Sequence, residues 1–247
     1  MLGLPAGVTA CLFDLDGVLT QTARVHAAAW KEMFDAYLRR RAAEHGERYA
    51  PFDAVADYDD YVDGRPRYEG VRAFLSSRGI ELPRGSPSDP PDRETTDGLG
   101  NHKNELVLRM IHEQGVEPYA GSVRYVRAAR QAGLRRAVVS SSTNCRDVLR
   151  AAGIEDLFEE IVDGVVAERE HLHGKPAPDT FLAGARALAV TARQAAVFED
   201  ALAGVQAGRA GGFGYVVGVD RVGQAQALRA HGADVVVSDL QDLLKAA

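Results

Sequence analysis

The sequence is poor in cysteine and has no long apolar run. Cys11 and Cys145 are the two cysteines among 247 residues. Both lie beside apolar segments typical of strands, so we expect buried or half-buried free thiols in a reducing compartment. No uninterrupted apolar stretch approaches the ~20 residues of a membrane span, and the first ten residues lack the features of a signal peptide. We therefore expect a cytoplasmic protein with no membrane partner.

The sequence also has no excess of positive charge. Its net charge of −6 argues against nucleic acid or an anionic membrane as the main partner. A local site for a single anion stays open, because local charge can oppose the net sign. Hydrophobic residues make up 46% and charged residues 26% of the chain, which is ordinary for a globular protein with a real core. We see no internal repeat.

The second half of the chain alternates between strand-like and helix-like segments. Apolar runs with little polar alternation predict strands at 136–141, 161–166, 194–200, 214–219 and 233–238. Helical patterns lie between them at 144–153, 179–190, 201–211 and 222–232. Such strands separated by helices predict an α/β fold with a Rossmann-like parallel sheet covered on both faces. The opening strand, 8–14, belongs to the same sheet.

The region between the first strand and this alternation has a different pattern. Residues 24–46, 68–79 and 101–115 have apolar residues at helical spacing, and we see no good strand among them. Residues 83–100 are rich in Pro, Gly, Ser and Asp, so we expect a loop. We infer an all-helical domain over 23–116, inserted into an α/β core formed by 1–22 and 117–247.

Two carboxylates follow the first strand. Asp14 and Asp16 are separated by one leucine and followed by Gly17. Side chains at i and i+2 of a strand point the same way, and ligands of open α/β sheets bind at the carboxyl ends of the strands. Two crowded carboxylates are costly unless a cation lies between them or one is protonated, and Mg²⁺ prefers such oxygen ligands. The alternative is that one Asp caps a turn and the other is solvated.

Three more polar groups follow predicted strands. Ser140, Ser141, Ser142 and Thr143 precede a helix, where hydroxyls and backbone N–H groups can bind an anion or simply cap the helix. Lys175 precedes prolines that could present it as a fixed positive charge, although it could also be a solvated lysine. Glu199 and Asp200 end another strand, as a second acid pair or as a helix cap. The combination of all four is unexpected by chance.

This ordered set resembles the haloacid dehalogenase-like phosphotransferase superfamily. "DLDGV" is similar to its first motif, Ser140 to the second, Lys175 to the third, and "ED" at 199–200 to the fourth. The resemblance implies Asp14 as the nucleophile and Asp16 as the acid and base. It also implies phosphate contacts from Lys175 and the 140–144 segment and a bound Mg²⁺. The implied residue sets are Ser140, Ser141, Ser142, Asn144 and Lys175 for phosphate, and Asp14, Asp16, Glu199 and Asp200 for the metal.

Within the superfamily the sequence resembles the β-phosphoglucomutase family. "DLDGVLTQTARVHAAAW" is similar to the family pattern and implies roles for Thr22 in the linker and His26 near the acid and base. "DGRPR" resembles the substrate loop, with Arg67 as the arginine that contacts the distal phosphate. Two lysines of the family are replaced, by Asp63 and Thr143, which affects the implied sugar and second-phosphate contacts.

The resemblance implies interconversion of β-D-glucose 1-phosphate and glucose 6-phosphate through an aspartyl phosphate and a sugar bisphosphate. We expect a monomer whose partner is a small-molecule sugar phosphate. A small-molecule (sugar) phosphate phosphatase or phosphonate hydrolase of the same fold is the first alternative, because of Asp63 and Thr143. A non-catalytic, receiver-like module phosphorylated on Asp14 is the second, and it leaves Asp16 and the helical domain without a purpose.

Overall fold

The computed structural model describes residues 2–46 and 48–245. The chain divides into two compact units, Met1–Gln21 with Val116–Ala247, and Thr22–Gly115. The first unit contains the sheet, and the second consists of helices and loops. Among the described residues, no helix is both long and apolar enough to cross a membrane.

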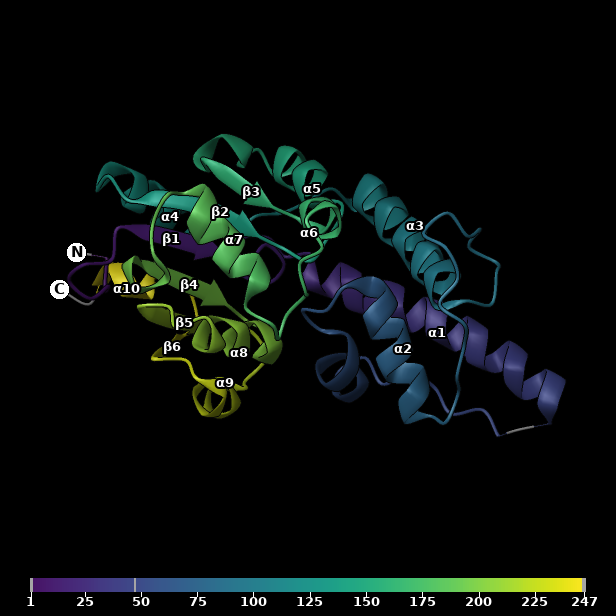
Figure 1. The fold of residues 1–247 in the computed structure, drawn as a ribbon. Helices are drawn as coiled ribbons and strands as arrows, with labels where there is room; N and C mark the ends of the chain where they lie inside the picture. The colour runs from purple at the N-terminus through teal and green to yellow at the C-terminus, as the bar shows by residue number, and fades with distance from the viewer. Residues whose placement is uncertain (1, 47, 246–247) are drawn as a thin grey trace. The chain divides into compact units, whose positions relative to one another are not determined.

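The first unit is built on a six-stranded sheet with the order β3-β2-β1-β4-β5-β6 (Figure 1). All neighbouring strands are parallel. The strands are β1 (Ala10–Phe13), β2 (Arg135–Val139), β3 (Glu160–Val162), β4 (Ala195–Glu199), β5 (Tyr215–Val219) and β6 (Val235–Val237). The central strand β1 lies between β2 and β4, so the segments that follow these three strands meet at one edge of the sheet. The predicted parallel α/β fold is confirmed.

Helices cover both faces of this sheet. They are α4 (Ala120–Gln131), α5 (Cys145–Ala151), α6 (Gly164–Arg169), α7 (Asp179–Ala187), α8 (Leu202–Ala210), α9 (Ala225–His231) and α10 (Asp242–Lys245), with 3-10 turns at Glu155–Leu157 and Ala192–Gln194. Leu12 of β1 faces one apolar cluster with Phe181 of α7 and Val205 of α8. Its neighbour Phe13 faces the other side, where its ring is 6.3 Å from that of Tyr125 on α4. Because successive side chains of a strand point to opposite faces, β1 contributes to the apolar cores on both sides of the sheet.

The second unit is an all-helical block. It contains α1 (Ala23–His45), a short π-helix at Tyr58–Val62, α2 (Arg67–Ser77) and α3 (Thr96–Gln114). Its core is aromatic. The ring of Phe34 on α1 lies 4.3 Å from that of Phe74 on α2 and 5.1 Å from that of Phe52 in the connecting segment. Apolar residues spaced three and four apart on each helix supply this shared core.

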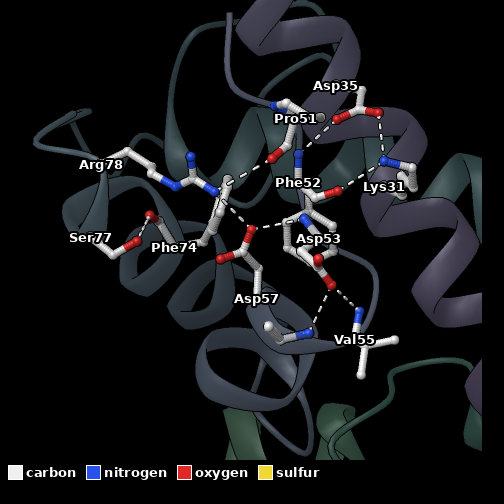
Figure 2. A network of polar contacts seen from close by, with 11 residues as sticks. Lys31, Asp35, Pro51, Phe52, Asp53, Val55, Asp57, Phe74, Ser77 and Arg78 are labelled. Atoms are coloured by element: carbon white, nitrogen blue, oxygen red, sulfur yellow. Dashed lines mark hydrogen bonds and ion pairs between the residues drawn. The ribbon is translucent and has the colours of Figure 1, made fainter.

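A polar network holds the segment between α1 and α2 in place (Figure 2). Asp35 accepts a hydrogen bond from the Phe52 N–H at 2.9 Å, and Lys31 donates to the Phe52 carbonyl at 2.8 Å. Arg78 and the backbone N–H of Asp53 both donate to Asp57, each at 2.8 Å. The chain between α1 and α2 is therefore tied to both helices, although part of it lacks regular structure.

Two predicted boundaries are wrong. The expected loop over 83–100 ends early, because α3 begins at Thr96 after the Thr95 side chain accepts a hydrogen bond from the Gly98 N–H at 2.9 Å. The expected strand over 161–166 is shorter: β3 ends at Val162, and the Asp163 carboxylate caps α6 by accepting from the Val166 N–H. In both places a side-chain cap starts a helix earlier than composition indicates.

Candidate active site

The end of β1 carries Asp14 into a buried polar site. Its backbone N–H donates to the Phe198 carbonyl at 3.0 Å, which continues the pairing of β1 with β4 by one residue. Because Phe13 is in register with Phe198, Asp14 lies opposite Glu199. Only 8% of Asp14 is exposed. The register of β1 with β4 thus brings Asp14, from the first predicted acid pair, beside Glu199, from the second.

Lys175 lies between these two acids. Its Nζ is 2.5 Å from Oδ1 of Asp14 and 2.5 Å from Oε1 of Glu199. It also donates to the Val139 carbonyl at the end of β2, at 3.2 Å. Only 1% of Lys175 is exposed, so this is a buried ion pair with satisfied donors and not a solvated lysine.

Glu199 is fully buried, and both of its carboxylate oxygens accept hydrogen bonds. Oε1 accepts from Lys175, and Oε2 accepts from the Ala201 N–H at 2.9 Å, just before α8. An added Cβ on Gly204 would lie 1.8 Å from Oε1, so a glycine is needed where α8 passes this carboxylate. These contacts hold Glu199 as an orienting partner of Lys175.

Asp200 completes an acidic cluster. Oxygen atoms of Asp14, Glu199 and Asp200 all lie within 4.8 Å of one another. The backbone carbonyl of Asp200 accepts from Gln224 at 3.0 Å, and its carboxylate packs against Gly17. Three carboxylates with one lysine leave an excess of negative charge, and oxygen donors are those that a hard divalent cation prefers. The cluster could therefore hold a metal ion.

The electrostatics of the pair follow from burial. Burial raises the pKa of the Asp14 carboxyl well above its ordinary value; the Lys175 ammonium opposes this rise, and Glu199 and Asp16 add to it. Burial also disfavours the charged form of Lys175, but the Asp14 and Glu199 carboxylates outweigh it and raise the pKa of the ammonium. Lys175 therefore stays charged, and further positive charge beside Asp14 would favour its ionised form.

The hydroxyl cluster follows β2, the other neighbour of β1. The buried Ser140 donates from its N–H to the Val162 carbonyl at 3.0 Å, and its Oγ accepts from the Ser142 N–H at 3.1 Å. The Ser142 Oγ accepts from the Asn144 N–H at 3.1 Å. Ser141 and Asn144 are half-buried in the same turn. The four residues thus form a compact turn that leads into α5, at the sheet edge where Asp14 lies.

Asp16 lies in the turn that follows Asp14. It forms an isolated bridge with Thr20, and Gly17 closes the turn through an N–H bond to the Thr20 carbonyl at 2.8 Å. Arg221 donates from Nε to the Gly17 carbonyl at 2.8 Å and stacks on the Tyr119 ring. Sequence motifs do not single out Arg221, because its role in this turn depends on a contact between residues 204 positions apart.

The remaining predicted residues belong to the helical unit. Thr22 precedes α1 and is buried, His26 lies in the first turn of α1, and Arg67 begins α2. Nδ1 of His26 lies 2.8 Å from Nζ of Lys103, which is 6% exposed and also lies 4.8 Å from the Trp30 ring. Lys103 is a candidate that the motifs miss. Its one sequence signal is a charged residue on the helix face that also carries Leu106 and Val107 to the core.

A known protein family and several known proteins match most of this chain. The haloacid dehalogenase-like hydrolase family matches residues 8–212. The β-phosphoglucomutase of Mycobacterium bovis is 58% identical over 99% of this chain and 94% of that protein. The fructose-1-phosphate phosphatase of Escherichia coli is 31% identical over 81% of this chain and 91% of that protein. A crystal structure of β-phosphoglucomutase from Clostridium difficile has a TM-score of 0.73 and 25% identity, covering 96% of this chain and 93% of that one.

Proposed function

This chain belongs to the β-phosphoglucomutase family of the haloacid dehalogenase-like hydrolases, and from that premise we propose that it interconverts β-D-glucose 1-phosphate and glucose 6-phosphate. The near full-length likeness to the Mycobacterium bovis enzyme carries the proposal. The buried Asp14–Lys175–Glu199 arrangement supports it, because phosphoryl transfer depends on positioning and on neutralising negative charge.

The chemistry assigned to the site is transfer through Asp14. A bond forms between the phosphorus and a carboxylate oxygen of Asp14 while the bond to the leaving sugar oxygen breaks. Asp16 gives its proton to that oxygen and later takes a proton from the other sugar hydroxyl. Lys175 and the 140–144 turn hold the remaining phosphate oxygens. The sugar bisphosphate supplies the phosphoryl group that Asp14 carries, and it is re-formed in each cycle.

The acidic cluster fits Mg²⁺. Asp14, Asp200 and the backbone carbonyl of Asp16 would hold it, with Glu199 orienting Lys175 beside them. When bound, Mg²⁺ would supply positive charge against both the phosphate oxygens and the attacking carboxylate. Burial raises the pKa of the Asp14 carboxyl, and a cation held beside it would oppose that rise.

We also propose that the helical domain, 23–116, is a cap that excludes water during transfer. Thr22 would lie in its linker, His26 would act near Asp16, and Arg67 would bind the distal phosphate. Lys103 would support His26 from α3. The free thiols of Cys11 and Cys145, both buried, fit action in a reducing compartment such as the cytoplasm.

A sugar-phosphate phosphatase is the second candidate. Asp63 and Thr143 stand where the family has lysines, and the Escherichia coli relative is a phosphatase. A coupled assay with each anomer of glucose 1-phosphate, with and without glucose 1,6-bisphosphate, separates the two. A mutase yields glucose 6-phosphate from the β anomer, needs the bisphosphate and releases no phosphate. Stoichiometric release of phosphate would refute the mutase and leave the phosphatase.

A further inference from the structure

Arg67 is held against the start of α3 by two residues. Its Nη2 donates a hydrogen bond to Oδ1 of Asn101 at 3.1 Å. Its aliphatic stem lies over Gly100, where an added Cβ would be 3.3 Å from Cγ and 3.5 Å from Cδ of Arg67. The helix therefore presents a small residue beneath the stem and an acceptor at the end of the side chain.

The amide of Asn101 has one orientation that satisfies its neighbours. Nδ2 donates to the Pro87 carbonyl at 3.0 Å and to the Asp89 carbonyl at 2.8 Å. An amide nitrogen has two hydrogens to donate, and the two carbonyls take both. A flipped amide would place its oxygen against two acceptors. The backbone of the preceding loop thus turns Oδ1 of Asn101 toward Arg67.

The loop that supplies these carbonyls is itself held by a buried acid. We refer to residues 84–95 as the clamp loop. The Asp89 carboxylate accepts from the Thr95 hydroxyl at 2.7 Å, from the Ser86 N–H at 3.1 Å and from Arg93 at 3.2 Å. The loop also crosses α3 closely, because an added Cβ on Gly98 would lie 2.3 Å from the Arg93 carbonyl oxygen.

We propose that Gly100 and Asn101 are positioning residues for Arg67, and that the clamp loop sets the orientation of the Asn101 amide. The proposal rests on the proposed function, in which Arg67 binds the distal phosphate. A guanidinium that is oriented before binding loses less conformational freedom when it meets a phosphate. The clamp loop thereby acts on substrate affinity without a contact to substrate of its own.

Binding measurements test this chain of contacts. The measurements use full-length Asp14→Asn protein with Mg²⁺, and calorimetry gives the Kd of glucose 1,6-bisphosphate. Calorimetry also gives the Kd of inorganic phosphate, which probes the core site alone. Asn101→Leu should raise the bisphosphate Kd about tenfold, since it removes one charge-assisted hydrogen bond. Arg67→Ala should raise it at least as much. Adding Asn101→Leu to Arg67→Ala should have no further effect, and neither change should alter phosphate binding.

Gly100→Ala separates positioning from folding. Alanine should raise the Tm by about 2–4 °C, because it is the better helix former in an interior position. It should also weaken bisphosphate binding roughly threefold, because the Arg67 stem must shift by a few tenths of an ångström to make room for the new methyl group. If Gly100 had only a structural role, Gly100→Ala would not both raise the Tm and weaken bisphosphate binding.

Ser88→Ala is the matched control in the clamp loop. Its hydroxyl is exposed and lies 3.0 Å from Ser86 Oγ, so affinity should not change. The proposal would be overturned if Asn101→Leu raised the bisphosphate Kd by the same factor in proteins with Arg67 and with Arg67→Ala. It would also be overturned if neither Asn101→Leu nor Gly100→Ala changed the bisphosphate Kd. Unchanged binding by Arg67→Ala would instead refute the role of Arg67 on which it rests, while mutase activity would remain to be judged by the anomer assay.

Discussion

The carboxylate of Asp200 occupies the space in which a side chain on Gly17 would lie. An ideal Cβ on Gly17 would be 1.7 Å from Oδ2 of Asp200, and Gly17 also has a φ of +81°. The turn after Asp14 therefore needs glycine for two separate reasons, backbone conformation and close approach. The close approach of Asp200 to Gly17 links the acidic motif that follows β1 directly to the one that ends β4.

Gly17→Ala should abolish turnover and weaken metal binding. The methyl group must displace the Asp200 carboxylate, so the Mg²⁺ Kd from calorimetry should rise by about tenfold or more. Gly212→Ala is the control, because Gly212 has a φ of +68° and no atom within 4 Å of an added Cβ. Both variants should lose about 1 kcal/mol of stability from backbone strain, but only Gly17→Ala should lose metal affinity. Equal effects of both on Mg²⁺ would contradict the close-approach argument.

Lys175→Met should destabilise the metal-free protein at neutral pH. Two buried carboxylates would lose their shared cation, which costs about 3–5 kcal/mol in comparable sites. The pKa of Asp14, already raised by burial, would rise further. A carboxyl whose pKa is higher in the folded than in the unfolded protein does not lower the free energy of unfolding at a pH below its unfolded pKa. The loss of stability grows as the pH rises from there through the folded pKa. Urea unfolding in EDTA should therefore show a small deficit at pH 4 and a large one at pH 8.

Adding Asp14→Asn to Lys175→Met tests the cause of that loss. The double variant should be more stable than Lys175→Met at pH 8, because one of the unpaired acids is gone. Lys31→Met, which removes a half-exposed lysine from Asp35, should cost far less. A pH-independent deficit in Lys175→Met would point to a packing defect in place of unpaired charge.

Asp16→Asn should separate proton transfer from metal binding. Losing a general acid and base should lower kcat by roughly 10²–10⁴-fold with glucose 1-phosphate. The Mg²⁺ Kd should stay near that of the wild type, because the assigned ligand is the backbone carbonyl of Asp16. Asp14→Ala serves as the comparison and should lose both turnover and metal affinity. Weakened Mg²⁺ binding in Asp16→Asn would place its carboxylate among the ligands.

Asp35 should make the helical unit sensitive to acid. Burial raises the pKa of Asp35, but hydrogen bonds from the Phe52 N–H and Lys31 outweigh it and lower the pKa below its ordinary value. An acid with a lowered folded pKa adds stability above its unfolded pKa of about 4. That stability is lost as the pH falls through the folded value.

Urea unfolding of Asp35→Asn should therefore show a deficit of about 1 kcal/mol at pH 7, and the deficit should shrink below pH 4. Glu44→Gln, at an exposed position of the same helix, should match the wild type at both pH values. A deficit in Asp35→Asn that persists unchanged at pH 3 would show that the loss comes from the neutral amide's geometry and not from the charge.

Local patterns in the sequence predicted the sheet and the acids that follow its first strand. Apolar runs and two-residue spacing are properties of consecutive residues, so β1 and the acids after it could be recognised directly. The start of α3 was missed because composition marked 83–100 as loop, whereas the decisive signal was a single cap at Thr95. A side-chain cap of this kind outweighs the average character of its surroundings.

Patterns along the chain suffice to predict the parallel α/β architecture and the inserted helices, and they mark Asp14, Lys175, Glu199 and Asp200 as candidates. How these four side chains meet depends on the three-dimensional fold. Lys175 and Asp14 are 161 positions apart, and His26 and Lys103 are 77 apart. Such contacts depend on sheet register and helix packing, which no local pattern records, and so do the glycines that make room for Glu199 and Asp200.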